Sequence, residues 1–202
     1  MMTEKLNILF FQWIHSGAGQ QPILDKTAVS CAVCGPYVLS VVLVLLWFFS
    51  NMAQKISLLE ATEAGLIGLI INQAIGLFYF HPRPFMEGLC TSLIPHIPET
   101  SFPSDHVSLL TAASGYVLFF SRRRISGALL WGITCLTAWA RVYAGLHFPL
   151  DMLGAVAVGV FSIGIVRQLK TWSYPVNERL FQIYDRLASG ISLYFHSSNP
   201  TR

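Results

Sequence analysis

Three short polar segments carry the residues that could do chemistry in this chain. They read HPRPF at 81–85, SFPSDH at 101–106 and RVYAGLHFPLD at 141–151. Guanidinium groups hold their donors in a fixed fork that suits phosphate, and two of them can neutralise a phosphoryl group during transfer. The segments therefore predict phosphate chemistry by two arginines, two histidines, a serine and an aspartate: Arg83, Ser104, His106, Arg141, His147 and Asp151.

The two histidines are expected to have different roles. Pro149 suits the first position of a helix, which places Asp151 in the first turn, close enough to accept a hydrogen bond from the His147 imidazole. Such a bond fixes the tautomer and leaves the other ring nitrogen free to act as a nucleophile. His106 is the available donor of a proton to the leaving group, and the base for the water that hydrolyses the phosphohistidine.

The segment that ends in His106 also has the features of a helix start. Pro103 suits the first helical position, so the backbone amides of Ser104, Asp105 and His106 would point outward at an anion. The hydroxyl of Ser104 would add a further donor. This helix start is predicted to be an anion cradle.

The composition indicates which elements position these segments. Of 202 residues, 53% are hydrophobic and 11% are charged, and the mean hydropathy is +0.55. This is too apolar for an ordinary soluble domain, so we expect an integral membrane protein. The net charge of +3 is scattered along the chain, which excludes nucleic acid as a partner.

We expect an all-α, polytopic membrane helix bundle with about five transmembrane helices. No charged residue occurs between Lys26 and Lys55, which leaves room for the first span. Apolar residues at helical spacing before this span indicate a helix in the membrane interface. The other spans are expected at 57–80, 103–120, 125–141 and 149–166. The chain then forms one unit with three parts, an interfacial helix at 1–20, a transmembrane catalytic bundle at 27–170 and a cytoplasmic tail at 171–202.

The alternation of the spans brings the polar segments together. The end of the second span, the start of the third, the end of the fourth and the start of the fifth must share one side of the membrane. The opposite side holds most of the basic residues, and the positive-inside rule makes it cytoplasmic: Lys55, Arg122, Arg123, Arg124, Arg167, Lys170, Arg179, Arg186 and Arg202. The polar cluster is therefore expected to face outward.

Other polar residues give weaker signals. Asn72 and Gln73 are uncommon within a span and are expected to face the bundle interior, where they either bind substrate or join helices. His81 is an additional candidate because it lies two positions before Arg83. The remaining histidines have no obvious partner and are expected in loops or at the interface: His15, His96 and His196.

No metal or other cofactor is predicted. Glu87, Glu99 and Asp105 are isolated acids rather than a converging group, so the chemistry is expected to be metal-independent. Cys31 and Cys34 form a CAVC pair without a second pair of ligands, which favours helix packing over metal binding. No disulfide framework is expected.

The three polar segments resemble the motifs of the type 2 phosphatidic acid phosphatase superfamily, over roughly residues 55–170. The segments that carry the resemblance are HPRP, PSDH and RVYAGLHFPLD. The resemblance implies that His147 is the nucleophile, that Asp151 orients it and that His106 is the general acid. It also implies three phosphate ligands, which agree with those drawn from residue chemistry: Arg83, Arg141 and Ser104.

The chain departs from this family pattern at two positions in the motifs. The first motif usually has a lysine seven positions before its arginine, where this chain has Gly76. Asn72, Gln73 or His81 could supply the missing contact. The second motif usually has glycine between serine and histidine, where this chain has Asp105, whose carboxylate must point away from phosphate or be paired.

The PSDH variant and the ending RVYAGLHFPLDMLGA further resemble the bacterial undecaprenyl-diphosphate phosphatases linked to bacitracin resistance. This resemblance implies hydrolysis of undecaprenyl diphosphate to the monophosphate, for lipid carrier recycling in peptidoglycan synthesis. It implies a bacterial inner membrane, an active site facing the periplasm or exterior, and lipids rather than proteins as partners. The alternatives are a phosphatase of phosphatidylglycerol phosphate, phosphatidate or another lipid phosphate, a lipid phosphotransferase, and a lipid-phosphate binder or transporter without activity.

Overall fold

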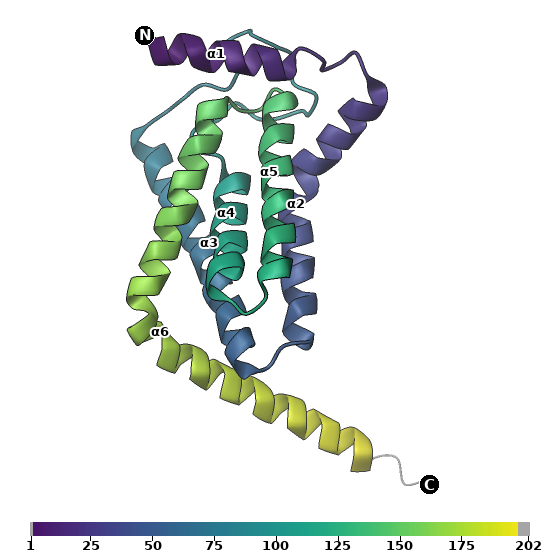
Figure 1. The fold of residues 1–202 in the computed structure, drawn as a ribbon, viewed down its shortest axis with the longest axis vertical. Coiled ribbons are helices and arrows are strands. Elements are labelled where there is room, and N and C mark those ends of the chain that lie inside the picture. Colours follow the sequence, from purple (N-terminus) through teal and green to yellow (C-terminus); the bar gives the residue numbers. More distant parts are fainter. Residues whose placement is uncertain (1, 198–202) are drawn as a thin grey trace.

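The computed structural model describes residues 2–197, and this part of the chain forms six helices and no strand. The helices are α1 (Met2–His15), α2 (Pro22–Phe48), α3 (Met52–Phe78), α4 (Asp105–Phe120), α5 (Arg124–Tyr143) and α6 (Pro149–Ser197). The expected all-α membrane bundle is confirmed (Figure 1).

Four helices of the described chain are long and apolar enough to cross a membrane, namely α2, α3, α5 and the part of α6 at Pro149–Trp172. The expected third span is α4, which has 16 residues. At about 1.5 Å per residue it is about 24 Å long, shorter than a hydrocarbon core of about 30 Å. This helix is enclosed by the others and does not have to face lipid along its length.

Helix α4 lies at the centre of the bundle, where it contacts α2, α3, α5 and α6 (Figure 1). Small residues on its neighbours allow this close approach. A Cβ added at Gly127 would lie 2.4 Å from the Cα of Leu118, and one added at Gly159 would lie 2.7 Å from the side chain of Thr111. Larger residues at these positions would displace α4, including its first turn, which carries His106.

A buried carboxylate near the start of α3 is compensated within the bundle. Glu60 is buried, and its Oε2 accepts a hydrogen bond of 2.7 Å from the Tyr116 hydroxyl. Its Oε1 lies 3.1 Å from the Lys170 ammonium group. A charge within a span is costly unless it has such partners. The pair therefore ties α6 to α3 at the end of the bundle opposite to α1.

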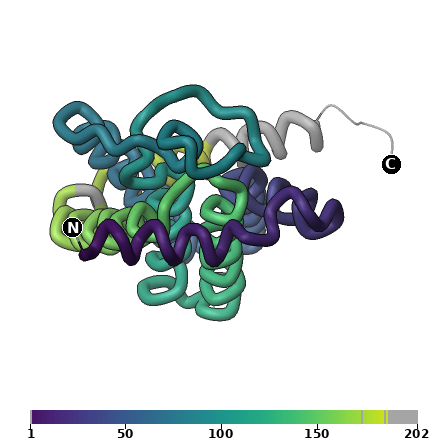
Figure 2. Tube along the Cα trace, turned by 90° about the horizontal axis from the view of Figure 1, so that it is seen from above, coloured from purple at the N-terminus to yellow at the C-terminus, as the bar shows by residue number. Residues whose placement is uncertain are grey.

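Helix α1 lies across one end of the bundle, as expected for an interfacial helix (Figures 1 and 2). Phe11 is buried against Phe148, with ring centroids 5.4 Å apart. The side-chain oxygen of Asn7 accepts a hydrogen bond of 3.1 Å from the Leu150 amide at the start of α6. Helix α1 therefore holds the loop between α5 and α6, which contains His147.

Helix α6 continues far beyond the expected end of the fifth span at residue 166. It runs from Pro149 to Ser197, bends, and then extends across the end of the bundle far from α1 (Figure 1). Pro175 lies within this helix and cannot donate a backbone hydrogen bond. The expected tail at 171–202 is therefore helical as far as the structure describes it, while residues 198–202 and the side chain of His196 lie outside the described residues.

Candidate active site

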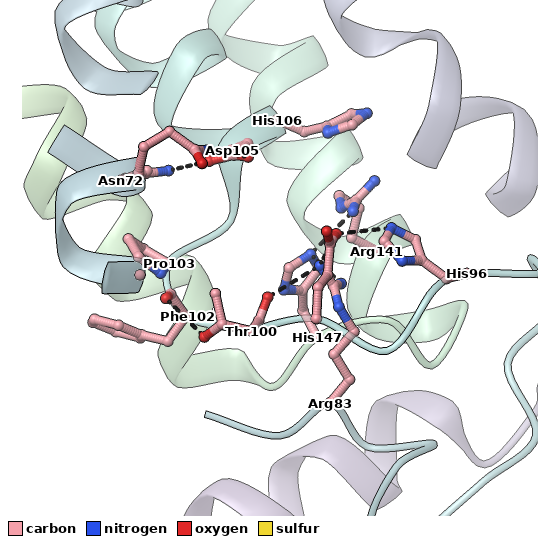
Figure 3. Close-up of a pocket in the computed structure, with 13 residues that line it drawn as sticks. Asn72, Arg83, His96, Thr100, Phe102, Pro103, Asp105, His106, Arg141 and His147 are labelled. Carbon is pink, nitrogen blue, oxygen red and sulfur yellow. Dashed lines mark hydrogen bonds and ion pairs between the residues drawn. The ribbon is translucent and has the colours of Figure 1, made fainter. Parts of the chain in front are cut away.

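A cavity of about 160 Å³ lies at the end of the bundle that α1 crosses (Figure 3). Such a volume suits a head group rather than a whole lipid, since pockets for drug-sized ligands measure about 300 Å³ or more. The lining residues come from the end of α3, the segment between α3 and α4, the start of α4, and the end of α5 with the loop that follows it. They are Asn72, Gln73, Gly76, Arg83, His96, Glu99, Thr100, Phe102, Pro103, Asp105, His106, Arg141 and His147. All three polar segments of the sequence thus meet here.

The two arginines converge on one ring nitrogen of His147. Its Nε2 lies 3.1 Å from Nη1 of Arg83 and 3.0 Å from Nη2 of Arg141. A guanidinium group only donates hydrogen bonds, so Nε2 must accept them with its lone pair. The proton of the neutral ring is then on Nδ1, which donates to the backbone carbonyl of Ser101 at 2.8 Å. The lone pair of a potential nucleophile and two phosphate-binding groups therefore face the same point.

Asp151 lies beside Nδ1 of His147, where the sequence placed it, but a backbone carbonyl lies closer to the ring. Its Oδ2 lies 3.5 Å from Nδ1 of His147, farther than the Ser101 carbonyl. The same oxygen accepts hydrogen bonds from the Ser101 hydroxyl and, at 2.7 Å, from the Phe148 amide. The Ser101 carbonyl is thus the nearest acceptor for the Nδ1 proton, and Asp151 adds a buried negative charge on the same side of the ring.

His147 is neutral at physiological pH. Burial is the main cause that lowers the pKa of His147 to about 3; the guanidinium groups of Arg141 and Arg83 act in the same direction, and Asp151 acts against them. The neutral ring is the nucleophilic form. His147 therefore has the protonation state that a nucleophile needs over the whole physiological pH range.

Both arginines are held by the surrounding chain. Arg83 donates from Nη1 to the Leu146 carbonyl at 3.0 Å and from Nη2 to the Thr100 carbonyl at 3.2 Å. Arg141 donates from Nη1 to the Ala32 carbonyl on α2 at 3.3 Å. Burial lowers the pKa of Arg83, but guanidinium groups stay protonated in proteins. The two positive charges are thus fixed before an anion arrives.

The start of α4 lies two residues later than the sequence indicated. Pro103 is not the first helical residue, because Ser104 is the N-cap and the helix begins at Asp105. The Ser104 side chain is fully buried, and its hydroxyl has no hydrogen-bond partner. His106 and Asp105 line the cavity, whereas Ser104 is not among its lining residues. The first-turn amides of α4 remain available to an anion.

The carboxylate of Asp105 is paired with amides from α3. The Nδ2 atom of Asn72 donates to one oxygen at 2.8 Å, and Nε2 of Gln73 donates to the other at 3.3 Å. Asn72 also donates to the hydroxyl of Ser108, at 3.0 Å. These contacts both join α3 to α4 and hold a negative charge in place at the wall of the cavity (Figure 3).

His81 does not line the cavity, which contradicts its use as a replacement for the lysine missing at Gly76. Its Nδ1 lies 3.5 Å from Oδ1 of Asp151, on the side of the carboxylate away from His147. Its ring packs edge-on against Phe148, with centroids 5.4 Å apart. His81 therefore belongs to the surroundings of Asp151, while Gly76 itself borders the cavity.

Four residues near the site or its supporting loop were missed or misjudged from sequence. His96 and Glu99 line the cavity, although they were expected to be a loop histidine and an isolated acid. His15 also has a partner, since its Nδ1 donates to the Tyr143 carbonyl at 2.7 Å. Ser101 was missed because a serine before a proline-rich turn has no distinctive signal. Its position as the first residue of the segment SFPSDH was the one hint of a role.

The described residues offer no built metal site. Among residues 2–197, no three side chains of histidine, cysteine, aspartate or glutamate lie close enough to hold an ion together. Cys31 and Cys34 lie on α2 as free thiols. The donors around the cavity are instead guanidinium, imidazole and amide groups, which suit an anion.

The membrane-type helical bundle holds a histidine between two arginines, an arrangement that suits the binding of a phosphate group beside a nucleophilic ring nitrogen. The sequence profile of the PAP2 superfamily matches residues 57–175, and the chain belongs to this superfamily. It is thus a multi-pass membrane phosphatase, as the sequence motifs indicated.

Individual relatives cover nearly the whole chain. Undecaprenyl-diphosphatase BcrC of Bacillus subtilis (strain 168) is 29% identical over 187 residues, which are 93% of this chain and 96% of that protein. YbjG of Escherichia coli (strain K12) is 31% identical over 182 residues, or 90% and 89% of the two chains. The crystal structure of LpxE from Aquifex aeolicus superposes with a TM-score of 0.66 at 25% identity, over 81% of this chain and 95% of that one.

Proposed function

We propose that this protein hydrolyses undecaprenyl diphosphate to undecaprenyl phosphate and inorganic phosphate, through a phosphohistidine intermediate and without a metal ion. The convergence of Arg83 and Arg141 on Nε2 of His147 carries the proposal. The similarity to a protein named undecaprenyl-diphosphatase supports the choice of substrate.

The first step forms a bond between Nε2 of His147 and the terminal phosphorus, while the bond from that phosphorus to the bridging oxygen breaks. The nonbridging oxygens replace Nε2 as acceptors of the hydrogen bonds from Arg83 and Arg141. His106 gives its proton to the departing lipid monophosphate. The His147 ring becomes positively charged as it forms the phosphohistidine, and Asp151 balances this charge from 3.5 Å.

The second step uses water as the nucleophile. His106, now neutral, takes a proton from the water as it attacks phosphorus. The bond between phosphorus and Nε2 breaks, and inorganic phosphate leaves. Each step moves one proton through His106 and returns the site to its starting state.

The cavity is proposed to face the periplasm or cell exterior. It lies at one end of the bundle, and the short basic turn of Arg122, Arg123 and Arg124 between α4 and α5 lies at the other (Figure 1). Basic residues favour the cytoplasmic side. The prenyl chain can then stay in the outer half of the bilayer while the diphosphate enters the cavity.

The test is phosphate release by the purified protein in detergent. Undecaprenyl diphosphate, phosphatidylglycerol phosphate and phosphatidate are compared, each with and without EDTA. We expect a preference for undecaprenyl diphosphate, no effect of EDTA, and loss of turnover in His147→Ala. A preference for a glycerolipid would refute the substrate, loss of activity in EDTA would refute the metal-free mechanism, and equal turnover by His147→Ala would refute the nucleophile.

A further inference from the structure

A carboxylate of the protein itself lies against the phosphate-binding groups. Oε1 of Glu99 lies 3.0 Å from Nη2 of Arg83 and 3.7 Å from Nε2 of His96. One oxygen thus faces two groups that can bind an anion. The Glu99 side chain is 47% exposed, so packing does not fix it there and another anion can replace it.

The guanidinium group of Arg83 spans two anion positions. Its Nη1 faces Nε2 of His147 at 3.1 Å, where the phosphoryl group that is transferred must lie. Its Nη2 faces Glu99 at 3.0 Å. The two nitrogens belong to one rigid planar group, so the second position is directly beside the first. Two adjacent anion positions match the two phosphates of a diphosphate.

His96 provides a second donor at this outer position. Its Nδ1 lies 3.1 Å from the Ile97 carbonyl, which can only accept, so Nδ1 carries a proton. The other ring nitrogen, Nε2, faces Glu99, and the residue lines the cavity. Figure 3 draws His96 at the Arg141 end of the cavity, with Asn72 and Asp105 at the other end. Nε2 of His96 would donate to a phosphate oxygen when it carries a proton.

We propose that His96 and Nη2 of Arg83 form a subsite for the second phosphate of the substrate, the one that bears the lipid, and that this phosphate displaces Glu99. The inference rests on the proposed diphosphatase function and adds a specificity-determining residue to it. When no phosphate is bound, the Glu99 carboxylate occupies the subsite and compensates its positive charge. A monophosphate lipid fills only the position beside His147 and leaves Glu99 in place.

The subsite also suits the chemistry of a diphosphate. The leaving group of a lipid diphosphate is a phosphate monoester. Negative charge develops on the oxygens of this monoester as the bond to the bridging oxygen breaks. Charge-assisted hydrogen bonds at these oxygens stabilise the transition state more than the ground state. An alkoxide leaving from a monophosphate has no such oxygens to place against His96.

The test compares two substrates that share one tail, farnesyl diphosphate and farnesyl phosphate. For His96→Gln we expect kcat/KM to fall about tenfold for the diphosphate, the usual effect of one charge-assisted contact. For the monophosphate we expect a change of less than about twofold. Thr91→Ala, on the exposed part of the same segment, is the control and should leave both values unchanged. An equal fall for both substrates, or no fall for either, would overturn the subsite.

Glu99→Gln separates displacement from a positioning role. If the carboxylate competes with the second phosphate, its removal lowers KM for the diphosphate several-fold and leaves the monophosphate unchanged. If Glu99 instead positions Arg83, kcat/KM falls for both substrates, and the displacement is refuted. Failure of the proposed function has a different signature, because the wild-type protein would then not hydrolyse the diphosphate at all.

Discussion

Replacement of Asp151 by asparagine tests how the site stabilises its intermediate. In the proposed mechanism the ring of His147 becomes cationic when Nε2 bonds to phosphorus, and it does so between two guanidinium groups. Asp151 is the negative charge nearest to Nδ1, at 3.5 Å. With an effective dielectric constant of about 20, Coulomb's law gives about 5 kcal/mol for this pair. A loss of that size corresponds to a fall in kcat of roughly several thousandfold.

The asparagine variant keeps the shape of the site. An amide oxygen still accepts hydrogen bonds from the Ser101 hydroxyl and the Phe148 amide, and the Ser101 carbonyl still orients His147. The measurement is the rate of phosphate release under saturating substrate, with thermal unfolding in detergent as a check that the variant is folded. Ser101→Ala is the matched comparison, because it removes a donor to Asp151 but keeps the carbonyl.

The two variants should differ clearly. A hydrogen bond to a charged group contributes about 1.5–3 kcal/mol, so Ser101→Ala should lower kcat by about tenfold to a hundredfold, less than Asp151→Asn. A folded Asp151→Asn protein that keeps more than a tenth of wild-type kcat would refute the electrostatic role. Equal losses in the two variants would show instead that the hydrogen-bond network, rather than the charge, is what matters.

Two further predictions concern pH and the wall of the cavity. Burial lowers the pKa of His147 to about 3, so NMR titration of the substrate-free protein should show a neutral His147 ring down to pH 5. A titration midpoint above pH 6 would contradict the buried position of this ring. In the unfolded chain the pKa of His147 is 6.5, so between about pH 3 and pH 6.5 the unfolded chain binds more protons at this residue than the folded protein does. His147 therefore makes the free energy of unfolding rise with pH over this range. Asn72→Ala should free the Asp105 carboxylate to repel phosphate and raise KM by about tenfold with little change in kcat, as for a like charge near a ligand. Adding Asp105→Asn should restore KM, and absence of this rescue would show that Asn72 acts by joining helices.

The site was predictable where chemistry depends on residue type and unpredictable where it depends on backbone geometry. Arg83, Arg141 and His147 were identified because the alternation of the spans gathers residues of complementary chemistry on one side of the membrane. The pairing of Asp105 was anticipated because a free acid beside phosphate is unfavourable. The Ser101 carbonyl was not, because every residue has a carbonyl and sequence does not say where it points.

The sequence by itself determined the membrane bundle, the side of the membrane shared by the three polar segments, and the likeness of these segments to known phosphatase motifs. The bundle follows from the length of the apolar stretches, and the shared side follows from the alternation of successive spans across the membrane. Both can be determined from the order of residues along the chain. Only the tertiary structure decided that Ser101 orients His147, that His81 lies behind Asp151, and that Glu99 and His96 border the cavity. Distances of a few ångströms between segments depend on how helices pack and loops fold back, and no single segment encodes them.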